Sequence, residues 1–91
     1  MVVEYLASYD RAFRHLSAAI QVHTVQVIDR LLDYFSTGQR PHGLGLTRLR
    51  RDYWEVRVGL RLRILFELGK DRVAFIFVGD HDAIRNWLKG R

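Results

Sequence analysis

The apolar residues change their spacing once along this chain, and that change constrains the fold more than any other feature. Over residues 10–37 they recur at helical intervals, so that Phe13, Leu16 and Ile20 share one face. From Trp54 onward they alternate with charged residues, which is the spacing of a half-buried strand. The sequence therefore predicts an α+β fold, with helices in the first half and a sheet built mainly from the second.

The expected elements follow from this pattern in chain order. The pattern predicts a strand over 2–6 and a helical segment over 10–37 that divides into two helices near Ser17. It then predicts three strands joined by short hairpins, over 54–58, 62–68 and 72–78, and a closing helix over 82–89. Gly38 is expected to end the second helix in a left-handed conformation, and Gln39–Gly45 to form a loop. The strand over 72–78 is apolar on both faces, as in the centre of a sheet. The prediction is a βααβββ(α) chain with a mainly antiparallel four-stranded sheet and helices on one face.

Length and composition indicate one domain over residues 1–91, because a chain of this size supports a single core. Its apolar runs are short and interrupted by Arg, so no membrane insertion is expected. Glu4, Asp10 and Arg11 fall where a signal peptide needs apolar residues, which predicts a cytoplasmic protein. The absence of Cys excludes disulfides and thiolate zinc sites.

The excess of positive over negative charge lies wholly in the second part of the chain. Residues 1–38 hold three Arg and four acidic residues, whereas residues 39–91 hold twelve Lys or Arg and six acidic residues. Ten of those twelve cations are Arg, whose planar guanidinium pairs bidentately with phosphate and stacks on bases. This favours an anionic partner, although a basic surface that keeps a small protein in solution would have the same composition.

Strand alternation predicts where the arginines gather. Arg57, Arg61 and Arg63 occupy the polar parity of two neighbouring strands, so they should share the face that the helices leave open. Like charges about 5–8 Å apart across a sheet repel, and a bound anion would relieve that repulsion. Arg63 is the strongest functional candidate, because an Arg among apolar mid-strand residues destabilises the fold unless it reaches water or an anion.

The same stretch resembles a known family. Y-W-E-V-R-V-G-L-R-L-R-I-L-F-E-L from Tyr53 to Leu68 is similar to the RelE-like toxins of bacterial toxin–antitoxin pairs. F-V-G-D-H-D from Phe77 to Asp82 resembles their final strand and its exit, and G-L-G-L-T-R-L-R from Gly43 to Arg50 fits their route into the second strand. The resemblance covers nearly the whole chain in element order and is strongest over the last forty or so residues.

The resemblance implies a chemistry that needs neither metal nor cofactor. Members that cleave mRNA in the ribosome use a ribose 2′-hydroxyl to attack the adjacent phosphate, leaving a 2′,3′-cyclic phosphate. Arg57 and Arg63 match basic residues on two of the family's strands, and His81 falls where relatives place an Arg or His. Trp87 falls where several relatives place a catalytic or stacking Tyr. Because an indole N–H is no acid near neutral pH, Trp87 does not match a role that needs a phenolic proton.

Each candidate also has a structural interpretation. Arg63 could pair with Glu55 or Glu67 across the sheet, and Glu55 could be a catalytic base or a structural counter-ion. His81 could transfer protons, because histidine ordinarily titrates near pH 6.5, or could be a residue of a helix-capping turn. Candidates for holding RNA, each with a packing or solvated alternative, are Arg48, Arg50, Arg51, Arg61 and Trp87. His15, His23 and His42 lack metal-ligand spacing.

Two functional hypotheses follow from the resemblance. The first is an endoribonuclease toxin that acts on mRNA at the ribosome and is neutralised by an antitoxin. The antitoxin would be an acidic segment that covers the cationic face or displaces the helix containing Trp87. The second is a ParE-like inhibitor of DNA gyrase without hydrolytic activity, or an inactive scaffold, since one fold can host either outcome.

Overall fold

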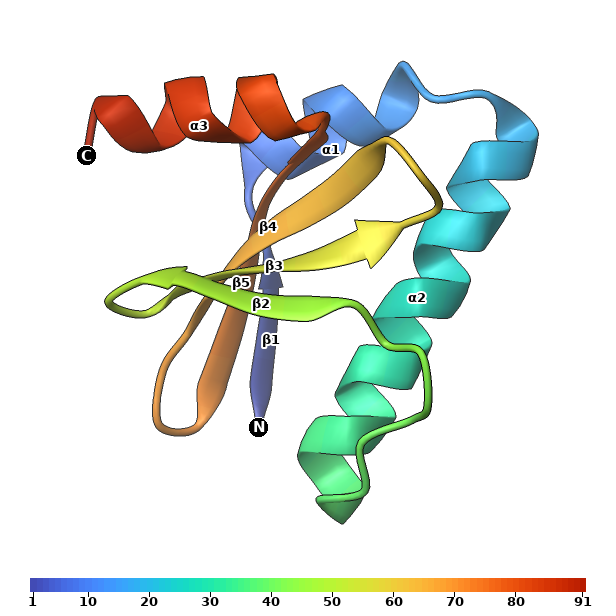
Figure 1. The fold of residues 1–91 in the computed structure, drawn as a ribbon, viewed down its shortest axis with the longest axis vertical. Helices are drawn as coiled ribbons and strands as arrows, with labels where there is room; N and C mark the ends of the chain where they lie inside the picture. The colour runs from blue at the N-terminus through green and yellow to red at the C-terminus, as the bar shows by residue number, and fades with distance from the viewer.

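A five-stranded mixed sheet forms the middle layer of the structure, which a computed structural model describes for residues 1–91 (Figure 1). The strands lie in the order β1-β5-β4-β3-β2, with β1 parallel to β5 and all other neighbours antiparallel. The elements are β1 (Val2–Tyr5), α1 (Ala7–Arg14), α2 (Ala18–Thr37), β2 (Leu46–Arg50), β3 (Tyr53–Val58), β4 (Leu62–Leu68), β5 (Arg72–Gly79) and α3 (His81–Lys89).

The predicted α+β class and element order are confirmed, with one strand more than expected. The additional strand is β2, which pairs with β3 and makes Arg48 and Arg50 strand residues. A register shift between these two residues breaks the alternation that would mark a strand in the sequence. The strand over 72–78 is central as predicted, because β5 lies between β1 and β4.

Local signals set the ends of the long helix. The Ser17 side chain accepts a hydrogen bond from the N–H of Ile20 at 3.3 Å, so Ser17 caps α2 where the helical pattern was expected to divide. Gly38 ends α2 with φ of 75°, the left-handed conformation that glycine adopts without a steric penalty. The first helix begins at Ala7, earlier than the expected start at Asp10.

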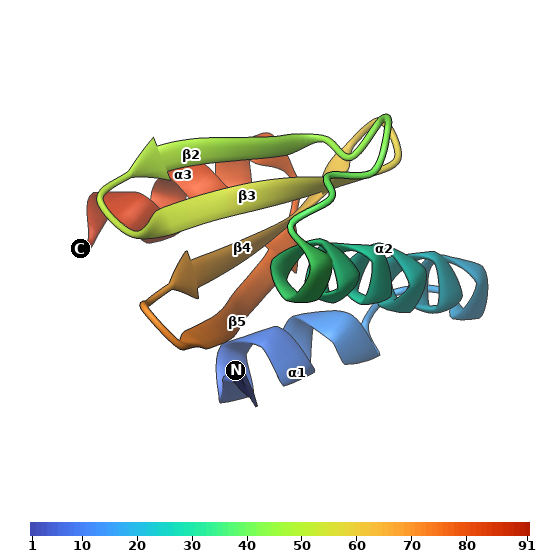
Figure 2. The same cartoon turned by 90° about the horizontal axis from the view of Figure 1, so that it is seen from below.

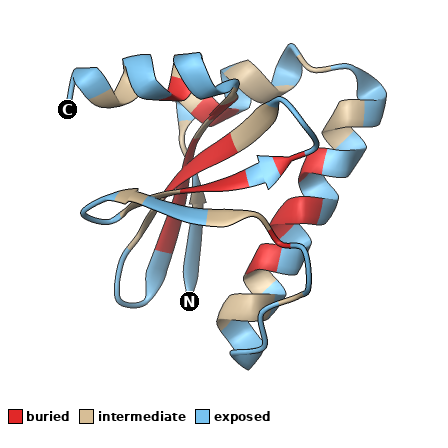
Figure 3. Ribbon diagram, in the orientation of Figure 1, coloured by how far each residue is buried: buried red, intermediate tan, exposed pale blue.

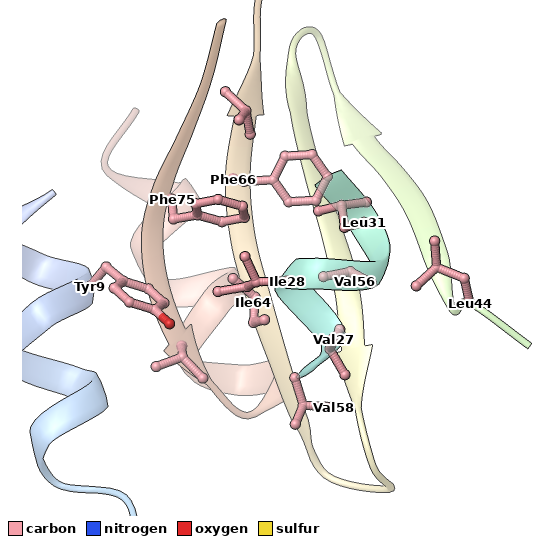
Figure 4. Close-up of a cluster of buried hydrophobic side chains, with 12 residues drawn as sticks. Tyr9, Val27, Ile28, Leu31, Leu44, Val56, Val58, Ile64, Phe66 and Phe75 are labelled. Carbon is pink, nitrogen blue, oxygen red and sulfur yellow. The ribbon is translucent and has the colours of Figure 1, made fainter. Parts of the chain in front are cut away.

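The main core lies between the sheet and the pair α1 and α2. Figure 4 shows Phe66 and Phe75 of the sheet facing Ile28 and Leu31 of α2, with Tyr9 of α1 at one side. In Figure 3 the buried residues follow the inner side of α2 and the central strands. Burying one Phe, Leu or Ile side chain stabilises the fold by about 1.5–3 kcal/mol. The main core therefore fixes the positions of α1 and α2 on the sheet.

The opposite face of the sheet is partly covered by α3. Ile84 of α3 packs on Leu65 and Ile76 of the sheet in a second, smaller core, with Trp87 at its margin. Figure 2 shows α1 and α2 together on one side of the strands and α3 on the other. The expectation of helices on one face is therefore wrong, because the short amphipathic α3 buries its apolar side against residues of the other parity.

None of the helices combines the length and the apolar character that crossing a membrane requires.

Candidate active site

Arg57 and Arg63 face each other across two neighbouring strands and leave the sheet on the same side. They form a residue pair in the antiparallel register of β3 and β4. Val56 and Ile64, the adjacent residues, are fully buried in the main core. Alternation therefore turns the two arginines, together with Glu55, toward the face that carries α3.

Arg63 is held between a carboxylate and an imidazole. Its Nη1 lies 2.8 Å from Nδ1 of His81, and its Nε lies 3.3 Å from Oε2 of Glu55. Both members of the ion pair are largely buried, since 20% of the Arg63 side chain and 11% of the Glu55 side chain remain exposed. The Nε is within ion-pair distance but is not aligned for a hydrogen bond, and it is buried without a hydrogen-bond partner. Glu55 therefore holds Arg63 mainly by charge.

The contact with Arg63 determines the tautomer of His81. A guanidinium has donors and no acceptor, so Nδ1 of His81 must accept the hydrogen bond through its lone pair. The ring proton of the neutral imidazole is then on Nε2. A second ring proton would set two donors against each other and break the contact. His81 thus presents an N–H donor on the nitrogen that Arg63 does not use.

A shallow hollow of about 260 Å³ brings these groups to the surface. It is lined by Leu60, Arg61, Arg63, Asp80, His81 and Asp82. The Asp80 carboxylate caps α3 by accepting the N–H of Ala83 at 2.8 Å, which satisfies one of its oxygens. Neither aspartate forms an ion pair with Arg61 or Arg63. Arg61 therefore stays available to an anion, whereas Arg63 is already paired with Glu55 and in contact with His81.

Arg57 owes its position beside this cluster to a glycine. Its backbone N–H donates to the carbonyl of Gly45 at 2.9 Å, where the chain enters β2. A Cβ atom on Gly45 would lie 2.9 Å from the Cβ of Arg57 and 3.7 Å from its Nε. The missing side chain lets the two strands approach closely, and the Arg57 side chain extends over that glycine.

Arg48 of β2 does not lie with Arg57 and Arg63. Arg48 pairs in register with Trp54, and its guanidinium carbon lies 5.9 Å from the centre of that ring. Trp54 packs against the main core, so Arg48 belongs to the face covered by α2. The Arg48 Nε donates to the carbonyl of Arg51 at 2.7 Å, in the turn after the strand. Arg48, one of the candidates for holding RNA, therefore lies on the opposite side of the sheet from Arg57 and Arg63, because alternation sends it there.

The Arg50 side chain hydrogen-bonds to the C-terminal end of α3. Its Nη2 donates to the carbonyl oxygens of Leu88 and Arg91, at 2.6 Å and 2.5 Å. These carbonyls belong to the C-terminal end of the helix and beyond, where a cation is favourable. The contact ties α3 to the edge strand β2.

Trp87 lies on α3, towards the end of the helix that is farther from the hollow at Arg63. It is six residues after His81, which corresponds to about 9 Å along a helix axis. Its ring meets Tyr53 edge-on, with centroids 5.6 Å apart, and the Arg91 guanidinium carbon lies 3.9 Å from its centre. The residue is partly buried beside the second core, in agreement with its packing interpretation.

Leu60, Asp80 and Asp82 line the hollow but were not among the candidate site residues of the sequence. An Asp directly before an amphipathic helical segment is a capping signal, and that signal would have identified Asp80. Leu60 carries no comparable signal. It stands in the β3–β4 turn with 92% of its surface exposed.

No group of three or more His, Cys, Asp or Glu side chains in the structure is arranged to hold a metal ion.

Comparison with known proteins finds no family model and no curated protein that matches the sequence. Solved structures do match. The toxin–antitoxin complex of RelB and RelE from Methanococcus jannaschii has a chain with a TM-score of 0.71 and 16% identity, covering 92% of this chain and 96% of that chain. A chain of the DinJ–YafQ complex of Escherichia coli has a TM-score of 0.65 and 17% identity, and the match covers 90% of this chain and 93% of that chain. A YoeB/ParE toxin from Agrobacterium tumefaciens has a TM-score of 0.64 and 18% identity, and the match covers 89% of this chain and 99% of that chain.

The chain has the RelE-like toxin fold. The match extends over about nine tenths of the chain, so the resemblance seen in the last strands holds for the whole architecture. Identities below 20% establish the fold, and the RelE-like fold alone does not fix a chemistry. The function has to be inferred from the residues at the site.

Proposed function

We propose that this protein is the toxin of a toxin–antitoxin pair and cleaves mRNA without a metal ion. The observation that carries the proposal is the Arg63 guanidinium, fixed between Glu55 and His81 at the edge of a surface hollow. In the cleavage, the ribose 2′-oxygen bonds to the adjacent phosphorus and the bond to the 5′-oxygen breaks. The products are a 2′,3′-cyclic phosphate and a 5′-hydroxyl.

Arg63 supplies charge stabilisation in this proposal. The pentacoordinate phosphorus carries more negative charge than the starting phosphodiester, and a preorganised guanidinium stabilises it without moving during the reaction. Arg57 and Arg61 add positive charge on either side, since Arg57 is the cross-strand neighbour of Arg63 and Arg61 lines the hollow. Glu55 is a positioning residue here, because it is buried and paired with Arg63.

His81 is the proton donor in this proposal. In the neutral ring Nδ1 accepts from Arg63, and loss of the Nε2 proton from that form would leave an imidazolate. The acid is therefore the imidazolium, in which a second proton has entered at Nδ1 and the contact with Arg63 has opened. It gives its Nε2 proton to the departing 5′-oxygen and keeps the proton on Nδ1. The 2′-hydroxyl proton passes to water. The combination of Arg57, Arg63 and His81 on one face supports cleavage over the non-hydrolytic alternative, the inhibition of gyrase, because a gyrase inhibitor would not require it.

The proposed partners are mRNA at the ribosome, in the cytoplasm, and an antitoxin protein. Two of the similar structures are complexes of a toxin with its antitoxin, RelB with RelE and DinJ with YafQ. The chain has a formal charge of +5. Arg57 is the cross-strand neighbour of Arg63, Arg61 lines the hollow beside Arg63, and of the nearby carboxylates Glu55 alone forms an ion pair with these arginines, while Asp80 and Asp82 line the hollow unpaired. Both RNA and an acidic antitoxin segment are complementary to that surface.

The experiment is an in-vitro cleavage reaction with a chelator present, in which the RNA ends are identified chemically. Ribosome-bound mRNA and free RNA are tested in parallel, together with a gyrase supercoiling reaction. Cyclic phosphate ends that depend on Arg63 support the proposal. Inhibition of supercoiling with intact RNA would instead support the ParE-like alternative.

A further inference from the structure

We propose that a second hollow, between α1 and α3, binds a nucleotide of the same RNA strand. This hollow is about 660 Å³, against about 260 Å³ for the one beside Arg63, and is large enough for a small ligand. Among the residues that line it are Arg11 of α1, His15 at the C-cap of that helix, Trp87 of α3 and Arg91. No acidic residue lines it. This inference rests on the proposed function in taking RNA as the ligand.

The cations of this hollow have no acidic partner within the protein. The ion pairs of the structure join Arg63 to Glu55 and Arg72 to Glu4, so Arg11 and Arg91 are in neither. Arg11 of α1 and His15, the helical C-cap of α1, are both exposed and are four residues apart, which places them on the same side. Two guanidiniums and an imidazole without counter-ions form a site that favours a phosphate.

The hollow also offers a flat stacking surface. The guanidinium carbon of Arg91 lies 3.9 Å from the centre of the Trp87 ring, and Phe77 lines the same space. Bases stack on aromatic rings and on guanidinium planes with little dependence on sequence. A nucleotide, which joins a flat base to a phosphate, matches both parts of the hollow. An acidic peptide would match the cations but would leave the stacking surface unused.

α3 connects this hollow to the proposed active site. Its first residue, His81, lines the hollow at Arg63, and Trp87 lines the second one. The two residues are separated by about 9 Å along the helix axis, a span that neighbouring nucleotides of one strand can cover. Arg85 and Lys89 are exposed on α3 and continue the positive charge along it. The two hollows together would hold consecutive parts of one RNA chain.

The test is to measure binding with an RNA that cannot be cleaved. A short fluorescent 2′-O-methyl oligonucleotide is titrated with the wild type and with Arg11→Gln and His15→Gln, at several salt concentrations. Arg14→Gln is the matched control, since Arg14 is exposed on α1 and does not line the hollow. Arg11→Gln should weaken binding about tenfold and lower the slope of log K against log salt by about 0.7, the loss of one single-strand phosphate contact. Arg14→Gln should change neither.

Titration with adenosine monophosphate identifies the stacking surface. In a Trp54→Phe background Trp87 is the remaining tryptophan, and its fluorescence should be quenched by the nucleotide less strongly in Arg11→Gln. Equal affinities for Arg11→Gln and Arg14→Gln would overturn the inference. So would loss of antitoxin binding in Arg11→Gln with RNA binding unchanged, which would assign the hollow to a protein partner. Because no cleavage is measured, the subsite can be established even if the wild type proves unable to cut RNA.

Discussion

Replacing Glu55 with Gln tests whether a buried ion pair positions the proposed catalytic arginine. The substitution keeps the side-chain shape and removes the charge that lies 3.3 Å from Arg63 Nε. Breaking a fully buried pair costs about 3–5 kcal/mol. Arg63 retains 20% exposure and is not aligned for a hydrogen bond with Glu55, so a loss of roughly 1–2 kcal/mol is expected here. For a domain of this size that lowers Tm by roughly 5–15 °C.

The assay is thermal and urea unfolding of Glu55→Gln beside Glu67→Gln. Glu67 is on β4, is half-buried and forms no ion pair, so its substitution should change stability by less than about 0.5 kcal/mol. The double variant Glu55→Gln/Arg63→Gln should recover part of the stability lost by Glu55→Gln, because it leaves no unpaired charge. Cleavage by Glu55→Gln should fall while its pH dependence keeps its shape. Equal stability of Glu55→Gln and Glu67→Gln, with full activity, would refute the positioning role.

Three further predictions concern His81, Tyr9 and the antitoxin. His81→Gln should slow cleavage by about 10²–10⁴ and flatten the limb of the pH–rate profile near neutrality, and an unchanged profile would remove His81 as a proton donor. Burial raises the pKa of Tyr9 to about 12, so its protonated form is favoured in the folded state. This contributes up to about 2.7 kcal/mol to the free energy of unfolding. The contribution is fully present below pH 10 and is lost as the pH rises from 10 to about 12. Alkaline unfolding of Tyr9→Phe should not show this loss. The antitoxin, co-expressed from a neighbouring reading frame, should associate more slowly as salt increases; a salt-independent rate would show that the cationic face does not steer it.

The parts of the fold that the sequence predicted are those governed by local patterns. Ser17 and Gly38 mark the ends of α2 by capping chemistry, which depends on a few neighbouring residues. The alternation in β3 and β4 likewise reports which side chains face the core. β2 escaped prediction because its bulge interrupts that alternation within five residues.

The parts that were not predictable depend on how elements meet. An amphipathic pattern shows that α3 has an apolar side, but not that Ile84 packs against the face opposite α1 and α2. The Arg63–His81 contact depends on register, because Arg63 pairs with Gly79, two residues before His81. That register includes a shift between Leu65 and Phe66, which no local pattern encodes. The separation of Arg48 from the cluster has the same origin in pairing and alternation.

The most direct measurement of the central claim is single-turnover RNA cleavage by Arg63→Ala, with Arg14→Ala as control and a chelator present. Loss of a preorganised guanidinium should slow cleavage by about 10²–10³, while circular dichroism shows a folded protein and Arg14→Ala cuts at the wild-type rate. The wild-type products should carry 2′,3′-cyclic phosphate and 5′-hydroxyl ends. A folded Arg63→Ala protein that cleaves RNA as fast as the wild type would contradict the assignment of Arg63 to the active site.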